Sequence, residues 1–177
     1  MSRKVLFIHS SVDGHTSKIC DHMSKKFDQK FNTETMPLEK AQYKDIESNE
    51  IIIIGASIRY GNHRPLLYTF INQNEKILNQ RSAYFFTVNA VARRAEKRTI
   101  ENNPYVKKFL KKVNWSPKKI GIFPGKIDYP KYKFFDKHMI RLIMYFSGGP
   151  TDLNNSYEFT DWQEIDAFAE EIKKNNG

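Results

Sequence analysis

The chain has 177 residues, with 29 Lys and Arg against 20 Asp and Glu, and a formal net charge of +9. This length favours one domain over residues 1–177, large enough to bury a core between a sheet and its helices. The single cysteine, Cys20, excludes an internal disulfide, and no apolar run approaches the roughly 20 residues that cross a bilayer. Because the N-terminus enters an apolar strand without a signal-peptide pattern, we expect a cytoplasmic protein.

The positive charge is concentrated in one segment. Residues 93–141 contain 15 of the basic and 4 of the acidic residues, so the rest of the chain is nearly neutral. Such a segment is typical of contact with nucleic acid, an anionic membrane or an acidic substrate. Lysines on a solvated helix face, without any partner, are the alternative.

Apolar runs predict five strands, in chain order, with helical patterns between them. The predicted strands are 5–8, 33–37, 51–54, 82–88 and 119–123. Apolar residues recur at helical spacing over about 19–27, 65–71, 106–113 and 160–172. This alternation predicts an α/β fold with a doubly wound, five-stranded parallel sheet. Ligands of such sheets lie beyond the C-terminal ends of the strands, so we expect a site in the loops after strands one, three and four.

Residues 124–158 form an insertion before the last helix, because they are too many for an ordinary connection. A helix is predicted over about 136–146. Its apolar face would hold Phe135, Met139, Leu142, Ile143 and Phe146, and its polar face Lys137, His138 and Arg141. The pattern indicates a helix lying in a membrane interface, or one that packs its stripe on the core of its own domain.

The loop after the first strand has the composition of a phosphate site. It contains Ser10, Ser11, Val12, Asp13, Gly14, His15 and Thr16. Hydroxyl groups and backbone N–H groups at a helix N-terminus favour an anion. Without a lysine-bearing P-loop or a Gly-x-Gly-x-x-Gly pattern, the loop fits one phosphate, as in FMN. A plain turn with a helix cap is the alternative.

The loops after the third and fourth strands have small residues whose backbone groups suit the polar edge of a planar ring. Their candidates are Ser57, Ile58, Tyr60, Gly61, Thr87, Val88, Asn89, Ala90, Val91 and Ala92. Tyr60 is placed to stack on such a ring. We expect no metal site, because no histidines and carboxylates follow a metal-ligand spacing.

Several of these segments together resemble one family. They are 55–61, 89–99, 129–132 and 147–149, followed by Thr151 and Asp152. They resemble the flavodoxin-like, menaquinone-dependent protoporphyrinogen IX dehydrogenases, and the resemblance runs from the first strand to 160–162. Pro150 and Ala90 depart from the family pattern at the flavin rim.

The resemblance implies a flavodoxin-like fold, FMN, and peripheral association with the inner face of the cell membrane. It also implies oxidation of protoporphyrinogen IX to protoporphyrin IX in heme biosynthesis, with menaquinone or ubiquinone as the acceptor. Thr151 and Asp152 join the cofactor-binding candidates on this ground.

The substrate's propionates suggest cationic partners, since a guanidinium binds a carboxylate through two hydrogen bonds. The substrate candidates are Arg59, Arg93, Arg94, Lys97, Arg98, Tyr129 and Tyr132. A flavodoxin-type electron carrier or a quinone reductase is the alternative function. We expect no nucleic acid partner, because a nucleic-acid-binding module would leave the three cofactor loops unexplained.

Overall fold

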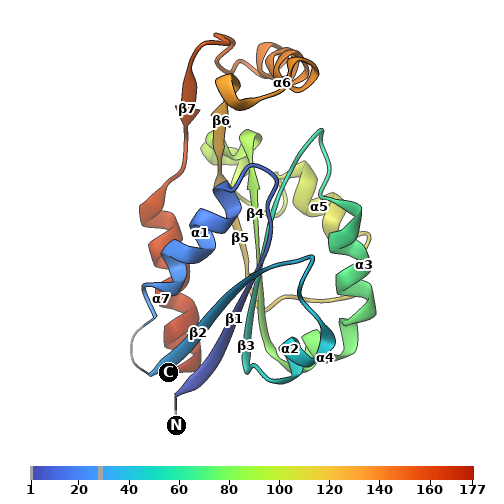
Figure 1. The fold of residues 1–177 in the computed structure, drawn as a ribbon, viewed down its shortest axis with the longest axis vertical. Coiled ribbons are helices and arrows are strands. Elements are labelled where there is room, and N and C mark those ends of the chain that lie inside the picture. Colours follow the sequence, from blue (N-terminus) through green and yellow to red (C-terminus); the bar gives the residue numbers. More distant parts are fainter. Residues whose placement is uncertain (1, 28–29) are drawn as a thin grey trace.

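The computed structural model describes residues 2–27 and 30–177, and its centre is one parallel sheet (Figure 1). The strands are β1 (Arg3–Ser10), β2 (Phe31–Pro37), β3 (Ile51–Ser57), β4 (Ser82–Asn89) and β5 (Ile120–Pro124). Their order is β2-β1-β3-β4-β5, and every neighbouring pair is parallel. Each overlaps a predicted strand, so the prediction of a doubly wound five-stranded sheet is confirmed. In this order β2 lies on one side of β1 and β3 on the other, so the chain changes direction across the sheet and the switch point lies between β1 and β3.

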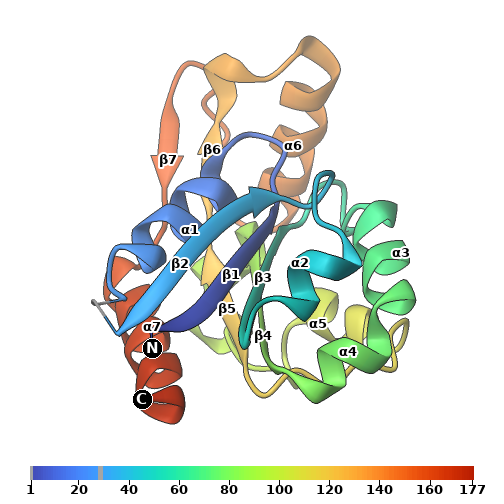
Figure 2. The same cartoon turned by 60° about the horizontal axis from the view of Figure 1, so that its bottom comes forward.

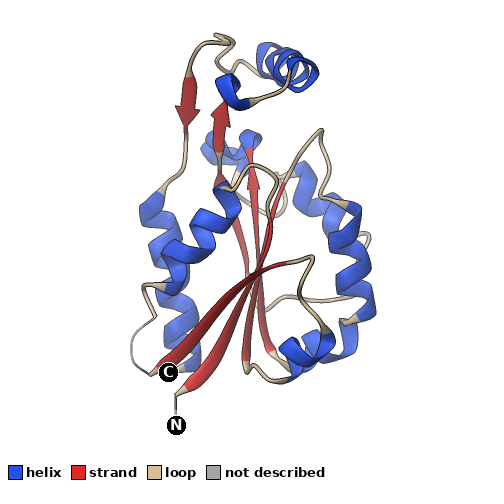
Figure 3. Cartoon of the chain, in the orientation of Figure 1, coloured by secondary structure: helices blue, strands red, loops and turns tan. Residues whose placement is uncertain are grey.

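Helices cover both faces of the sheet (Figure 3). One face carries α1 (His15–Ser24) and α7 (Trp162–Asn176). The other carries α2 (Tyr43–Glu47), α3 (Pro65–Gln73), α4 (Glu75–Gln80) and α5 (Pro104–Leu110). Successive residues of a strand point to opposite faces, so Val5 and Phe7 pack under α1 and α7, while Leu6 and Ile8 pack on the other side. Each such side chain is fully buried, a gain of roughly 1.5–3 kcal/mol before entropy is counted.

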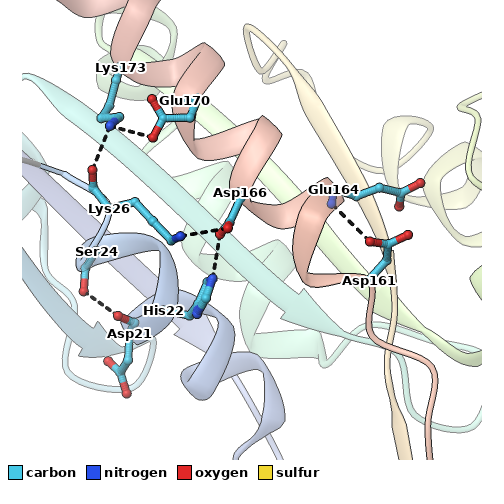
Figure 4. A network of polar contacts seen from close by, with 9 residues as sticks. All are labelled: Asp21, His22, Ser24, Lys26, Asp161, Glu164, Asp166, Glu170 and Lys173. Carbon is cyan, nitrogen blue, oxygen red and sulfur yellow. Dashed lines mark hydrogen bonds and ion pairs between the residues drawn. The ribbon is translucent and has the colours of Figure 1, made fainter.

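A polar network holds α1 against α7 (Figure 4). The carboxylate of Asp166 accepts hydrogen bonds from His22 at 2.6 Å and from Lys26 at 2.7 Å. Lys173 donates to the backbone carbonyl of Lys26 at 2.8 Å, from the next turns of α7. This network fixes the C-terminal end of α1 against α7, and a 2.7 Å contact between the side chains of His15 and Thr160 holds the residues before α7 beside the loop that follows β1.

The insertion leaves the sheet at the C-terminal ends of its strands (Figures 1 and 2). It contains β6 (Lys126–Asp128), the 3-10 turn η3 (Tyr129–Lys131), α6 (Phe134–Phe146) and β7 (Ser156–Glu158). Strands β6 and β7 form an antiparallel pair, which the sequence did not predict. Ile127, Tyr129 and Met144 are buried together in a small cluster apart from the two main ones.

The apolar stripe of α6 does not pack on the core of the sheet. Phe135 is 83% exposed, Phe146 78%, Leu142 53% and Met139 50%. The alternative in which this stripe joins the domain core is therefore wrong. Among the residues that the structure describes, no helix is long and apolar enough to cross a membrane.

Beyond β4, two 3-10 turns, η1 (Ala90–Arg93) and η2 (Ala95–Lys97), lead towards α5. His63 lies next to β4, and its ring Nε2 is 3.0 Å from the hydroxyl of Thr87 in that strand. The ring packs edge-on against Phe85 and Phe109. Burial in these aromatic surroundings lowers the pKa of His63 from 6.5 to about 4.

His63 should make the protein sensitive to acid. Because its pKa is lower in the folded state, the unfolded chain binds the proton first as pH falls, and stability is lost between pH 6.5 and about 4. Between about pH 7.5 and 4.5 the wild type should lose about 2 to 3 kcal/mol more unfolding free energy than His63→Phe, measured by urea denaturation. His138→Asn, at an exposed histidine of α6, should behave as wild type. Equal acid losses in His63→Phe and wild type would contradict this assignment.

Candidate functional site

A cavity of about 870 Å³, partly open to solvent, lies at the C-terminal edge of the sheet. Its walls come from the loops after β1, β3 and β4, from α5 and from the insertion. The lining residues of the three loops are Ser11, Val12, Asp13, His15, Thr16, Ser57, Ile58, Arg59, Tyr60, Gly61, Val88, Asn89 and Ala90. Those of α5 and the insertion are Tyr105, Gly125, Lys126, Ile127, Tyr132, Ile140, Ile143 and Met144.

The loop after β1 presents hydroxyl groups that lack partners. The side-chain oxygens of Ser10, Ser11 and Thr16 are buried and have no hydrogen-bond partner among the described residues. Leaving such a group unpaired costs about 1–3 kcal/mol, so a site with three of them is suited to a polar ligand. Thr16 lies in the first turn of α1, behind Gly14 at a φ of 82°. Free N–H groups at this helix N-terminus, together with the hydroxyls, fit a phosphate.

The loop after β3 turns back on itself within four residues. Arg59 and Asn62 exchange backbone hydrogen bonds of 2.9 and 3.1 Å. The two residues between them, Tyr60 and Gly61, have φ values of 49° and 75°. A left-handed conformation is easy for glycine but strained for tyrosine, and such strain concentrates at functional sites. The turn leaves the Tyr60 ring 47% exposed on the wall of the cavity, where it is free to stack on a planar ligand.

The loop after β4 is organised by Asn89. Its side-chain oxygen accepts a hydrogen bond from the Ala92 backbone N–H at 3.0 Å and another from Asn103 at 3.4 Å. Its side-chain NH₂ group is buried without a partner among the described residues and belongs to a residue that lines the cavity. This amide is therefore a free donor for the polar edge of a ring.

Arg59 and Lys126 are cations of the cavity lining, and Arg59 joins two other segments. One guanidinium nitrogen donates to both carboxylate oxygens of Asp13, at 2.9 and 3.1 Å, and the other donates to Asp136 at 2.6 Å. Burial alone would lower the pKa of Arg59, but the carboxylates of Asp13 and Asp136 outweigh it and raise the pKa. The guanidinium also lies 5.5 Å from the Tyr60 ring centre and 5.8 Å from that of Tyr132.

Comparison with known proteins agrees with this geometry. A family model described as a flavodoxin domain matches residues 6–154. The chain is 34% identical over 170 residues to the protoporphyrinogen IX dehydrogenase [quinone] of Escherichia coli K12, covering 96% of this chain and 94% of that one. The Leishmania major protein of the same name is 34% identical over 173 residues, covering 97% and 75%. The chain belongs to the quinone-dependent protoporphyrinogen IX dehydrogenase family.

Solved flavodoxins share the fold of this family member. The oxidised flavodoxin 2 of Bacillus cereus superposes with a TM-score of 0.56 at 13% identity, covering 97% of this chain and 99% of that one. Membership of the flavodoxin family implies a bound flavin, and the unpaired hydroxyls and amide described above fit one. The resemblance proposed from the sequence is confirmed.

Some of the predicted cofactor residues lie outside the cavity lining. They are Ser10, Gly14, Thr87, Val91, Ala92, Thr151 and Asp152. Thr87 points to the other face of the sheet, where its hydroxyl pairs with His63, and Ala92 is buried against Val106 and Ile122. Asp152 holds its own loop, since its carboxylate accepts hydrogen bonds from Asn154 and Asn155. Backbone contacts from these positions stay predictions.

The predicted substrate residues fall into two groups, those that line the cavity and those that do not. Of the seven, Arg59 and Tyr132 line the cavity. Arg98 donates to Glu164 at 2.8 Å and to the Ala92 carbonyl at 2.8 Å, so it ties the loop after β4 to the start of α7.

The other substrate candidates lie near this end of the molecule in different settings. Arg93 donates to the carbonyl and hydroxyl of Ser147 at the end of α6. Tyr129 is buried, and its hydroxyl donates to the Pro150 carbonyl at 2.8 Å. Arg94 is exposed, 3.7 Å from the Glu96 carboxylate, and Lys97 is partly exposed. Substrate contact by these residues stays a prediction.

The sequence did not identify the apolar wall of the cavity. Ile140 and Met144 lie one turn apart on the inner face of α6, and Ile127 of β6 and Tyr105 of α5 lie on the same cavity. Ile143 was assigned to the outer stripe, but it is 38% exposed and also lines the cavity. The four-residue spacing of Ile140 and Met144 was the available signal, because it marks a second apolar face on the helix.

The unpaired hydroxyls lead to a prediction about flavin retention. Ser11→Ala with Thr16→Ala should raise the Kd of the apoprotein for FMN by roughly 30-fold or more, because two hydrogen bonds to a charged phosphate are lost. Fluorescence titration would measure it. The Kd for riboflavin, which has no phosphate, should hardly change. Ser17→Ala is the control, since that hydroxyl pairs with His9. An equal loss for both flavins would show that the loop does not hold the phosphate.

Proposed function

We propose that this protein is an FMN-dependent oxidoreductase that converts protoporphyrinogen IX to protoporphyrin IX in heme biosynthesis and passes the electrons to a membrane quinone. The observation that carries the proposal is a cavity with two unlike walls. Its polar end fits a phosphate and the edge of a flavin, and its apolar roof belongs to the insertion. Identity of 34% along nearly the whole of a dehydrogenase of this name supports the substrate and the acceptor.

In this proposal FMN supplies the redox chemistry, and the protein supplies placement and charge. Ser11 and Thr16 hold the phosphate through their hydroxyls. Tyr60 stacks against the ring system from its strained turn, and Asn89 donates its free amide hydrogen to the polar edge. FMN fits better than a dinucleotide because the loop after β1 has neither the spacing nor the glycines of a dinucleotide site.

The tetrapyrrole would lie between the flavin and the insertion. Its ring system is large and apolar, which suits the wall formed by Ile127, Ile140 and Met144. Its propionates are anionic, and Arg59 is a cation on the same cavity. Tyr132 adds a partly buried aromatic ring beside Arg59.

The outer face of α6 supports contact with a membrane, where a lipid-dissolved quinone would be found. Phe134, Phe135, Tyr145 and Phe146 are each more than 70% exposed. Lys131, Lys133 and Arg141 are exposed on or next to the same helix. An apolar surface flanked by cations suits the inner, anionic face of a cell membrane, with each cation worth about 1 kcal/mol near the surface.

A quinone reductase is the second candidate, because an apolar cavity beside a flavin also fits a quinone alone. The two functions differ in the electron donor. A flavodoxin-type carrier is less well supported, since electron transfer between proteins gives no reason for a cavity roof.

Anaerobic turnover separates these candidates. The protein with FMN and a menaquinone or ubiquinone analogue should convert protoporphyrinogen IX to a fluorescent porphyrin, and omission of the quinone should stop the reaction after the bound flavin is reduced. Rapid quinone reduction by NAD(P)H with no porphyrin formed would favour the quinone reductase instead.

Vesicle binding tests the outer face of α6. Phe135→Ser with Phe146→Ser should weaken binding to phosphatidylglycerol vesicles at least about tenfold, because two large apolar side chains no longer enter the interface. Cosedimentation would measure it, and flavin content should not change. Tyr43→Ser on α2 is the matched control, since Tyr43 is also exposed, at 55%, on another part of the surface. Unchanged binding of the Phe variant would exclude this face.

A further inference from the structure

Helix α6 is the roof of the cavity, and its inner and outer faces have different surroundings. Ile140 and Met144 line the cavity, and Met144 is buried against the small cluster of Ile127 and Tyr129. The outer face is exposed. Apolar packing of Ile140 and Met144 holds the middle of the helix above the sheet (Figure 1), and polar contacts hold its two ends.

The N-terminal end of α6 is joined to Arg59 by Asp136, which lies in the first turn of the helix. The guanidinium donates to the Asp136 carboxylate at 2.6 Å, and the two side chains are 20% and 24% exposed. Arg59 is fixed in turn by its paired hydrogen bonds to Asp13, in the loop where the phosphate is expected. The roof is thus connected, through one guanidinium, to two of the loops that form the floor.

The C-terminal end of α6 is held in a different way. Arg93, in the loop after β4, donates to the backbone carbonyl and the hydroxyl of Ser147 and to the carbonyl of Ala90. A cation at this position also satisfies the negative end of the helix dipole. Gly148 follows at a φ of 67°, a conformation that glycine adopts readily. These contacts use backbone acceptors and involve no carboxylate.

We propose that Arg59 and Asp136 are positioning residues that form a salt-sensitive latch, which keeps α6 closed over the flavin and substrate. Opening of the latch admits the ligands, and its closure restores the apolar wall beside the flavin. The inference rests on the proposed function for the identity of the ligands. It differs from that function in predicting that the contact between Arg59 and Asp136 controls ligand exchange.

The ion pair is the contact that is suited to opening. Its two charges become hydrated when they separate, whereas an opened Arg93 contact would leave carbonyl groups without their donor. A substrate carboxylate can also replace Asp136 as a partner of Arg59, because a guanidinium binds either with the same geometry. The latch is therefore placed to open as an anionic substrate arrives.

Asp136→Asn tests the latch with little change in shape. In the FMN-loaded protein, the dissociation rate of FMN should rise about two- to fivefold, the effect of losing one partly exposed ion pair. The wild-type rate should increase between low and high salt, since salt screens an ion pair, and the variant rate should increase less, because only the pair of Arg59 with Asp13 remains. Trypsin should cleave at Lys133, Lys137 and Arg141 faster in the variant. Asp136→Glu, which keeps the charge, should restore the wild-type rates.

Two further variants separate the latch from other effects of the substitution. Glu101→Gln removes one negative charge from an exposed turn before α5, at a residue that belongs neither to the cavity lining nor to the insertion. It should behave as wild type. Phe134→Glu added to Asp136→Asn returns a carboxylate to the first turn of α6, but at a side chain that is 71% exposed. If Asp136 acted only on the helix dipole, this double variant would regain the slow dissociation.

The measured dissociation rates either support the latch or contradict it. Faster and less salt-dependent dissociation in Asp136→Asn, reversed by Glu at 136 and not by Glu at 134, supports the latch. Rates equal to those of Glu101→Gln, or rescue by Phe134→Glu, would overturn it. Flavin release and proteolysis need no tetrapyrrole, so an absence of porphyrinogen turnover would count against the proposed function and leave this test intact.

Discussion

The Arg59 guanidinium is the point at which three distant segments of the chain meet. It pairs with Asp13 in the loop after β1 and with Asp136 in the first turn of α6, 77 positions away in the sequence. Without it, the carboxylates of Asp13 and Asp136 would lose their shared partner, and Asp13 lies on the cavity wall. The ion pairs neutralise those carboxylates and keep a cation on the cavity wall. Arg59 thereby links the loops after β1 and β3 to the start of the roof, while Arg93 holds its other end.

The site also contains groups whose arrangement is unfavourable for folding. Buried hydroxyls at Ser11 and Thr16 have no partner among the described residues, and Tyr60 takes a left-handed backbone conformation. Each feature costs folding free energy, of the order of 1–3 kcal/mol. In the proposed function, the phosphate and ring of a bound FMN would supply the missing contacts and offset that cost. Binding of the cofactor should therefore stabilise the folded chain as well as equip it for chemistry.

The two faces of helix α6 have different surroundings. Ile140 and Met144 complete an apolar wall beside the flavin site, while Phe135 and Phe146 remain exposed on the outside. A short path between cavity and lipid would suit an enzyme whose acceptor is dissolved in a membrane. The basic segment is shared between this region and α5, whose lysines are exposed and show the properties of a solvated helix face. Only part of the net charge therefore lies beside the exposed apolar face of α6.

The sequence by itself determined the sheet, because continuous β-branched runs such as 51–54 fit a strand that is covered on both faces. It also determined which loops meet, since parallel strands end at one edge, and the family motifs identified the dehydrogenases. Tertiary structure alone decided the partners of the arginines: Arg98 pairs with Glu164 and Arg93 caps α6, although both resemble Arg59 in the sequence. It also decided that Ile140 and Met144, not the Phe135 stripe, face the protein. Periodicity shows which residues share a face, but the partner of a face or a charge is set by segments far away in the chain, and only the packed fold brings these together.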